Sequence, residues 1–239
     1  MSSLAQQVSA AGLADHILSE RRLGDLLGGG DARRYGLVNR ALKDGSLIRV
    51  KRGTYLLARR YRSEQAHPFA IAQGLVPGSY VSFESALSHH GWIPEGVFVT
   101  ASVSPRRKTL HFDSPDFGAF SYRPIAIQDY RFLTSIDRVS MGKLTAFVAQ
   151  PLRALMDLVA LRKEHWTGIE WLTSGLRIDD DLLLSLRRKD FTVLKPVYKH
   201  KAVNAFLEAL EQAVMAAKVS PVRQRAASPS APPEPWPNP

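Results

Sequence analysis

The sequence predicts an α+β protein made of a short N-terminal unit and a longer C-terminal unit. Three observations predict this division. A basic stretch ending near Arg62 contains a helical pattern followed by alternating strand residues. From about Pro68 the charge density falls and short strand-like runs appear, and after Pro151 the pattern becomes mainly helical. A chain of 239 residues is long enough for two domains with cores of their own.

The best-defined pattern is a helix that begins at Asp31, in the stretch DARRYGLVNRALKDG. We expect Asp31 to cap its N-terminus and Asp44-Gly45 to end it. At about 100° per residue, one arc of the helix carries the apolar residues: Leu37, Val38, Ala41 and Leu42. The opposite side carries the remaining polar and small residues: Arg33, Gly36, Asn39, Arg40 and Lys43. Arg34 projects towards the core side, although a long side chain in the first turn can still reach outwards.

A two-stranded hairpin is predicted directly after this helix, in the stretch LIRVKRGTYLL. Apolar and basic residues alternate along its first strand, which is the period of a strand with one buried face: Ile48, Arg49, Val50 and Lys51. Arg52-Gly53 is expected to form the turn, and Thr54 begins the return strand.

Two short helices are expected upstream, over residues 13–18 and 22–27, and the three glycines of residues 28–30 supply the following turn. Helices followed by a basic hairpin in this order are typical of winged helix-turn-helix domains. The glycine run has neither a following Gly-Lys-Ser/Thr nor a preceding apolar strand, which excludes a phosphate-binding P-loop. Residues 1–62 are therefore predicted to form a winged helix-turn-helix domain.

The positive charge of the chain is concentrated in this first unit. Residues 20–62 contain twelve Lys or Arg against four Asp or Glu, whereas the whole chain has a net charge of +10. A localised basic surface is typical of proteins that bind polyphosphates, although a solvated basic face is the alternative. Arginine and asparagine can pair bidentately with guanine and adenine in the major groove, while lysine more often contacts phosphate.

Double-stranded DNA is therefore the predicted partner of this unit. Nine residues are predicted to contact it, five from the helix and four from the hairpin: Arg33, Arg34, Asn39, Arg40, Lys43, Arg49, Lys51, Arg52 and Thr54. Tyr55 either packs against the helix or contacts DNA, and the pattern leaves both alternatives open.

The second unit, residues 63–218, is predicted to contain a small antiparallel sheet followed by helices on one side. Helices are expected at residues 68–75 and 83–90, with Ser82 as the N-cap of the second. Strands are expected at residues 97–103, 110–112, 119–122, 131–132 and 144–148. Pro151 suits the first turn of the next helix, and more helices are expected at residues 168–176, 180–188 and 202–217. Residues 219–239 are rich in proline and are predicted to be disordered, with the role of Trp236 left open.

No pattern in the second unit indicates catalysis, a cofactor or a metal. The four histidines at positions 67, 89, 90 and 111 lack metal-ligand spacing, and the aspartates of residues 179–181 suit the first turn of a helix. The absence of cysteine excludes disulfides and thiol catalysis.

Two basic clusters lie at residues 106–108 and 187–201. Three alternatives stay open for each cluster: it extends the DNA-contacting surface, it contacts an acidic partner, or it is a solvated loop. No apolar run reaches the about 18–20 residues of a membrane span, and we expect a cytoplasmic protein.

Two further segments follow the Arg-Gly-x-Tyr end of the hairpin in a recognisable order. The first matches Y-x-S-x-x-S-A-L-x-x-x-G at Tyr80, Ser82, Ser85, Ala86, Leu87 and Gly91. The second matches P-x-x-A-L-x-D-L at Pro151, Ala154, Leu155, Asp157 and Leu158. In this order, over residues 13–214, the chain resembles the AbiEi antitoxins of abortive-infection (type IV) toxin–antitoxin systems.

The resemblance implies two activities. The winged helix would bind the promoter of its own operon and repress it, and the second domain would counteract a nucleotidyltransferase-fold toxin, with direct contact left open. A transcription regulator whose second domain senses a small ligand is the alternative. A nucleic-acid-processing enzyme is a third hypothesis, against which stands the lack of a carboxylate or histidine constellation.

Overall fold

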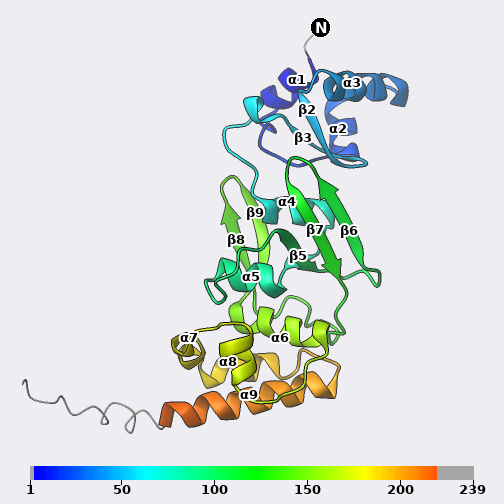
Figure 1. Ribbon diagram of the computed structural model, residues 1–239. Helices are drawn as coiled ribbons and strands as arrows, with labels where there is room; N and C mark the ends of the chain where they lie inside the picture. Colours follow the sequence, from blue (N-terminus) through cyan, green and yellow to red (C-terminus); the bar gives the residue numbers. More distant parts are fainter. Residues whose placement is uncertain (1–2, 220–239) are drawn as a thin grey trace, which may run out of the picture.

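The computed structural model describes residues 3–219. The described chain is a mixed α+β structure with a three-stranded and a six-stranded sheet. In Figure 1 the N-terminal helices and the small sheet form one end, the larger sheet lies in the middle, and the C-terminal helices form the other end. The tail predicted to be disordered, with Trp236, lies outside the described residues apart from Val219.

The N-terminal unit combines three helices with an antiparallel sheet of order β1-β3-β2. Its elements are α1 (Leu4–Ala10), β1 (Leu18–Ser19), α2 (Glu20–Leu27), α3 (Asp31–Lys43), β2 (Leu47–Lys51) and β3 (Thr54–Leu57), followed by the short 3-10 turn η1 (Arg59–Tyr61). The predicted second and third helices and the hairpin are confirmed. The helix expected at residues 13–18 is wrong, because the first helix starts earlier, where Ser3 and Gln6 form a capping box.

This unit has a hydrophobic cluster of its own. Val38 and Ala41 of α3 are buried in it and Leu37 and Leu42 are partly buried, which confirms the predicted apolar side of the helix. Tyr55 belongs to the same cluster and is 8% exposed. Of the two alternatives for this residue, the structure therefore selects packing inside the unit.

The second unit is built on a six-stranded mixed sheet of order β6-β7-β5-β4-β9-β8. The strands are β4 (Tyr80–Val81), β5 (Val99–Val103), β6 (Leu110–Ser114), β7 (Gly118–Arg123), β8 (Ile136–Met141) and β9 (Leu144–Ala149). β4 and β9 pair in parallel, as do β5 and β7. The sheet predicted for this unit was small and antiparallel, and this prediction is wrong, because the observed sheet has six strands and contains parallel pairs. The sequence did not reveal β4, since two residues are too few to show the period of a strand. The strand expected at residues 131–132 is a turn.

Helices cover this sheet and continue beyond it. They are α4 (Pro68–Leu75), α5 (Phe83–His89), α6 (Pro151–Arg162), the π-helical turn η2 (Trp171–Gly175), α7 (Asp180–Ser185), α8 (Arg188–Leu194) and α9 (Lys201–Val219). The single helix expected at residues 180–188 is two helices, because the backbone is extended at Leu186 and the Asp190 carboxylate accepts from the Arg187 N–H to start α8. None of the described helices is both long and apolar enough to cross a membrane.

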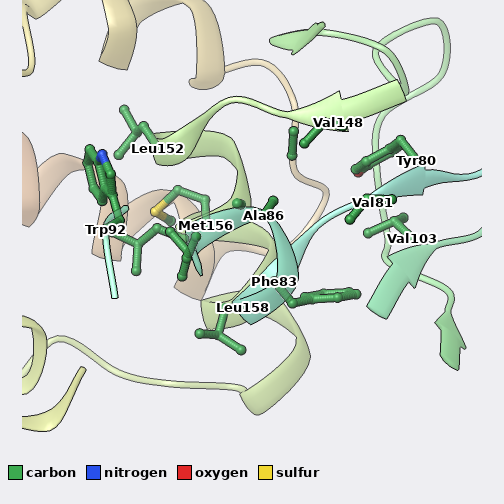
Figure 2. Packing of buried hydrophobic residues seen from close by; sticks show 14 of the residues in the cluster. Tyr80, Val81, Phe83, Ala86, Trp92, Val103, Val148, Leu152, Met156 and Leu158 are labelled. Atoms are coloured by element: carbon green, nitrogen blue, oxygen red, sulfur yellow. The ribbon is translucent and has the colours of Figure 1, made fainter. Parts of the chain in front are cut away.

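The core of the second unit joins the sheet to α5 and α6. Figure 2 shows side chains from β4, α5, β5, β9 and α6 packed together. Phe83 and Ala86 of α5 and Met156 and Leu158 of α6 are completely buried there. The motif segments of the second unit therefore lie at the centre of its core.

Polar contacts fasten the two units to each other. The Asp15 carboxylate accepts from the Ser63 N–H and hydroxyl, each at 2.8 Å, and its Oδ2 lies 3.1 Å from Nζ of Lys143 in the β8–β9 turn. The Lys143 N–H donates to Glu64. Burial raises the pKa of Asp15, but the hydrogen bonds from Ser63 and Lys143 outweigh it and lower this pKa to about 2. The β8–β9 turn is thus tied to the N-terminal unit and to the connection between the units.

Candidate nucleic-acid interface

α3 carries polar side chains on the side opposite its buried residues. Four of the predicted DNA-contacting residues are exposed along this side: Arg33, Asn39, Arg40 and Lys43. The helix starts after Gly30, which is its N-cap and makes no side-chain bond, so the cap expected at Asp31 is wrong. Asp31 is the first helical residue, and its carboxylate pairs with Arg34, three residues later on the same side of the helix.

Two arginines of α3 also interact with neighbouring groups. Arg34 is paired with Asp31, and its guanidinium lies over Gly24 of α2. Its side chain is 36% exposed. Nε of Arg40 donates to the Gly36 oxygen at 3.2 Å, and this side chain remains exposed. Arg40 is therefore better placed than Arg34 to contact a partner.

The hairpin presents two of its four predicted residues to solvent. Arg49 and Arg52 are exposed, and Gly53 has φ +75°, a conformation that favours glycine at the turn. Thr54 is 6% exposed and Lys51 is half-buried. The register shifts between Arg49 and Lys51, and such a bulge re-aims the side chains beyond it. Strict alternation could not anticipate this.

Lys51 is directed at the second unit instead of at solvent. Its Nζ donates to the carbonyl of Leu75, the last residue of α4, and lies 5.4 Å from the centre of the Phe112 ring in β6. Burial, and then repulsion from Arg106, lower the pKa of Lys51. This lysine therefore connects the hairpin to the larger sheet.

Sequence reasoning missed exposed groups near α3. Tyr35 is 58% exposed and precedes Asn39 by four residues, a spacing that places both on neighbouring positions of one helix side. Arg59 and Arg60 are also exposed, and Nη2 of Arg60 reaches the Asp44 oxygen at the end of α3, at 3.4 Å. In the sequence, the signal for Arg59 and Arg60 was their position directly after the predicted hairpin.

The two basic clusters of the second unit differ in how far their charges are neutralised. Residues 106–108 are exposed in the β5–β6 connection. In the cluster of residues 187–201, Nζ of Lys195 lies 2.8 Å from Glu211 and Nζ of Lys199 lies 3.2 Å from Asp129. The second cluster is therefore partly neutralised within the protein. In residues 3–219 no group of three or more His, Asp or Glu side chains could hold a metal ion.

Asp157 of α6 is the centre of a buried polar network. Its Oδ2 accepts from the Tyr80 hydroxyl at 3.0 Å and from the Ser82 hydroxyl at 2.7 Å. Its Oδ1 accepts from Nε of Arg153 at 3.0 Å and from the Tyr198 hydroxyl at 2.8 Å. Ser82 is the N-cap residue of α5, but its hydroxyl does not cap the helix as expected, because Asp157 takes it. The network joins β4, α5 and α6 to the residues before α9.

Burial and charge pairing shift the pKa values of three members of this network. Burial alone would lower the pKa of Arg153, but the Asp157 carboxylate raises it above its ordinary value. Burial, and then Asp157, raise the pKa of Tyr80 and of Tyr198 well above that of a free tyrosine. The motif residues Tyr80, Ser82 and Asp157 therefore have a structural role. Asp157 forms the buried ion pair with Arg153, and the hydroxyls of Tyr80 and Ser82 donate hydrogen bonds to it.

Comparison with known proteins adds no assignment. No model of a known protein family matches the chain, and no curated protein matches it. The case for a function therefore depends on the residues described above.

Proposed function

We propose that this protein is a DNA-binding antitoxin that represses its own operon and counteracts a nucleotidyltransferase-fold toxin. The N-terminal unit is the DNA-binding part, a winged helix-turn-helix in which α3 is the recognition helix and the β2–β3 hairpin is the wing. One observation carries this half of the proposal: Arg33, Asn39, Arg40 and Lys43 are exposed together on the side of α3 that faces away from the core.

The dimensions and chemistry of α3 suit the major groove of DNA. A helix with its side chains is about 10–12 Å across, and the groove is about 12 Å wide. Arg40 and Asn39 carry the paired donors and acceptors that read guanine and adenine edges, while Lys43 suits a phosphate. Arg49 and Arg52 of the wing are exposed beyond α3 and would meet the phosphate backbone.

The DNA-binding half is tested by fluorescence anisotropy with a labelled duplex from the promoter of the operon. Affinity should fall steeply with salt, since each neutralised phosphate contributes about −0.9 to the slope of log K against log salt concentration. A flat salt response would contradict DNA as the partner. A scrambled duplex of the same length separates specific from non-specific binding.

The antitoxin half is supported by the resemblance of the motif order to AbiEi antitoxins. Its test is co-expression with the nucleotidyltransferase-like reading frame expected beside the gene. A full-length Asn39→Ala, Arg40→Ala variant should lose repression and still protect cells from the toxin. Loss of protection in a folded variant would contradict the proposed division of labour.

One observation favours the alternative, a regulator whose second unit senses a small ligand. A cavity of about 710 Å³ in this unit is lined by His90, Trp92 and Gln150, among others. A gene neighbourhood without a nucleotidyltransferase-like reading frame would favour this alternative. Co-purification of the chain with such a neighbour would favour the antitoxin.

A further inference from the structure

A cavity of about 380 Å³ opens between α2, α3 and β3 of the N-terminal unit. Its apolar wall includes Leu23 and Val38, which are 2% and 9% exposed. Tyr35 and Tyr55 contribute two aromatic rings, and Glu20 and Asp25 contribute two carboxylates. The volume falls within the range of about 300–1,000 Å³ that small-molecule sites occupy.

The Tyr55 hydroxyl is available to a guest in this cavity. Tyr55 as a whole is 8% exposed and lines the cavity, and its hydroxyl makes no hydrogen bond to any residue in the described part of the chain. The hydroxyl itself is not fully buried, so water in the cavity reaches it. A ligand that accepts from or donates to this hydroxyl would take the place of that water.

The charges around the cavity favour a cation. Among residues 3–219, Glu20 and Asp25 form no ion pair. The two arginines that also line the cavity do not cancel them, because Arg34 is paired with Asp31 and only Arg21 is left. The free charges of the wall are thus two negative and one positive. Aromatic rings add to the attraction, since a cation is drawn to the face of a tyrosine ring.

We propose that this cavity binds a small organic cation, a primary amine carried on an aromatic or apolar body. The ammonium group would lie at Glu20 and Asp25, and the body would lie against Leu23 and Val38 between the tyrosines. Tyr35 and Val38 belong to α3, so an occupant contacts the helix that carries the exposed arginines. An effect of the bound amine on operator affinity would depend on the proposed function, whereas binding of the amine itself does not.

The test uses phenethylamine as the probe and 3-phenylpropionate as an anion of similar size, with the full-length protein and no DNA. Calorimetric titration should show saturable binding of the amine and none of the anion. Glu20→Gln with Asp25→Asn should raise the Kd of the amine about tenfold or more, because it removes two charge-assisted contacts. Tyr55→Phe, which keeps the ring in the core, should raise it several-fold.

A matched control replaces exposed carboxylates elsewhere, with Asp181→Asn and Glu208→Gln, and should leave the Kd unchanged. Circular dichroism verifies that every variant is folded. Absence of amine binding, equal binding of the anion, or wild-type affinity in the Glu20 and Asp25 variant would each overturn the proposal. Because DNA is absent from the titration, failure here is distinct from failure of operator binding.

Discussion

Lys51 lies in a strand expected to touch DNA, yet its ammonium group serves the protein itself. The carbonyls at the end of a helix lack partners within the helix, and the helix dipole makes that end negative. Leu75 closes α4 and supplies such a carbonyl. A cation placed there stabilises the junction between the units, which explains why a basic residue occupies a half-buried position.

We therefore expect Lys51→Ala to lower the free energy of unfolding by about 1–2 kcal/mol, because it leaves a partly buried carbonyl without its donor. Arg52→Ala, one residue along and exposed, should change it by no more than about 0.5 kcal/mol. Urea denaturation followed by circular dichroism measures both. Equal effects of the two variants would contradict the role given to Lys51.

Arg40 should carry the largest single contribution to sequence discrimination. Arg40→Ala is expected to weaken operator binding by about 1–3 kcal/mol, the worth of a bidentate base contact, while non-specific duplex changes less. Arg138→Ala, at an exposed position of β8, is the charge-matched control. Anisotropy titrations with the operator and the scrambled duplex measure the difference, and equal losses on both duplexes would make Arg40 a phosphate contact.

Asp157 accepts four hydrogen bonds inside the second unit. Asp157→Asn removes the charge that balances the fully buried Arg153 and is expected to destabilise the protein by about 3–5 kcal/mol. Ser82→Ala removes one hydroxyl donor from the same carboxylate and should cost about 1 kcal/mol. Thermal unfolding ranks the two variants, and a larger loss for Ser82→Ala would contradict the central position of Asp157.

At the scale of elements, the sequence predicts what local periodicity determines. The helix Asp31–Lys43 and the following hairpin are predicted because the spacing of apolar residues is visible within a few turns of chain. Pairing between distant strands leaves no such trace. The two-residue strand β4 sits between β5 and β9 in the sheet, and only the folded chain reveals that it does.

The candidate interface was predictable in part for the same reason. The exposed side of α3 follows from helical geometry, so Arg33, Asn39, Arg40 and Lys43 could be assigned from spacing. The position of Lys51 could not be assigned from spacing, because its orientation depends on the bulge in β2 and on contacts with α4 and β6, which are distant in sequence. Local rules therefore describe the helix and fail where the second unit intervenes.

At the scale of the whole molecule, the attachment of the two units should depend on pH. The folded pKa of Asp15, about 2, lies below the ordinary aspartate value of 3.8. A depressed carboxyl pKa stabilises the folded state above the unfolded value and loses this contribution as pH falls through the folded value. We expect the contribution, roughly 1 kcal/mol after solvent screening, to disappear between about pH 4 and pH 2.

Asp15→Asn provides the comparison for this effect. The variant should be less stable than the wild-type protein at pH 7 and equally stable near pH 2, as measured by urea denaturation at each pH. Asp181→Asn, at an exposed carboxylate of α7, is the control and should show no such convergence. A stability difference for Asp15→Asn that stays constant down to pH 2 would contradict the assigned pKa.

The contacts of Lys51 and Asp15 also limit how this protein can change over evolutionary time. A unit joined by a free linker can be exchanged between proteins, but the N-terminal unit of this chain shares its β2–β3 hairpin with α4 and β6 and its first loop with the β8–β9 turn. Grafted onto another body, it would leave an ammonium and a carboxylate without their partners. Positions 51 and 112, and positions 15 and 143, are therefore expected to vary together among homologues.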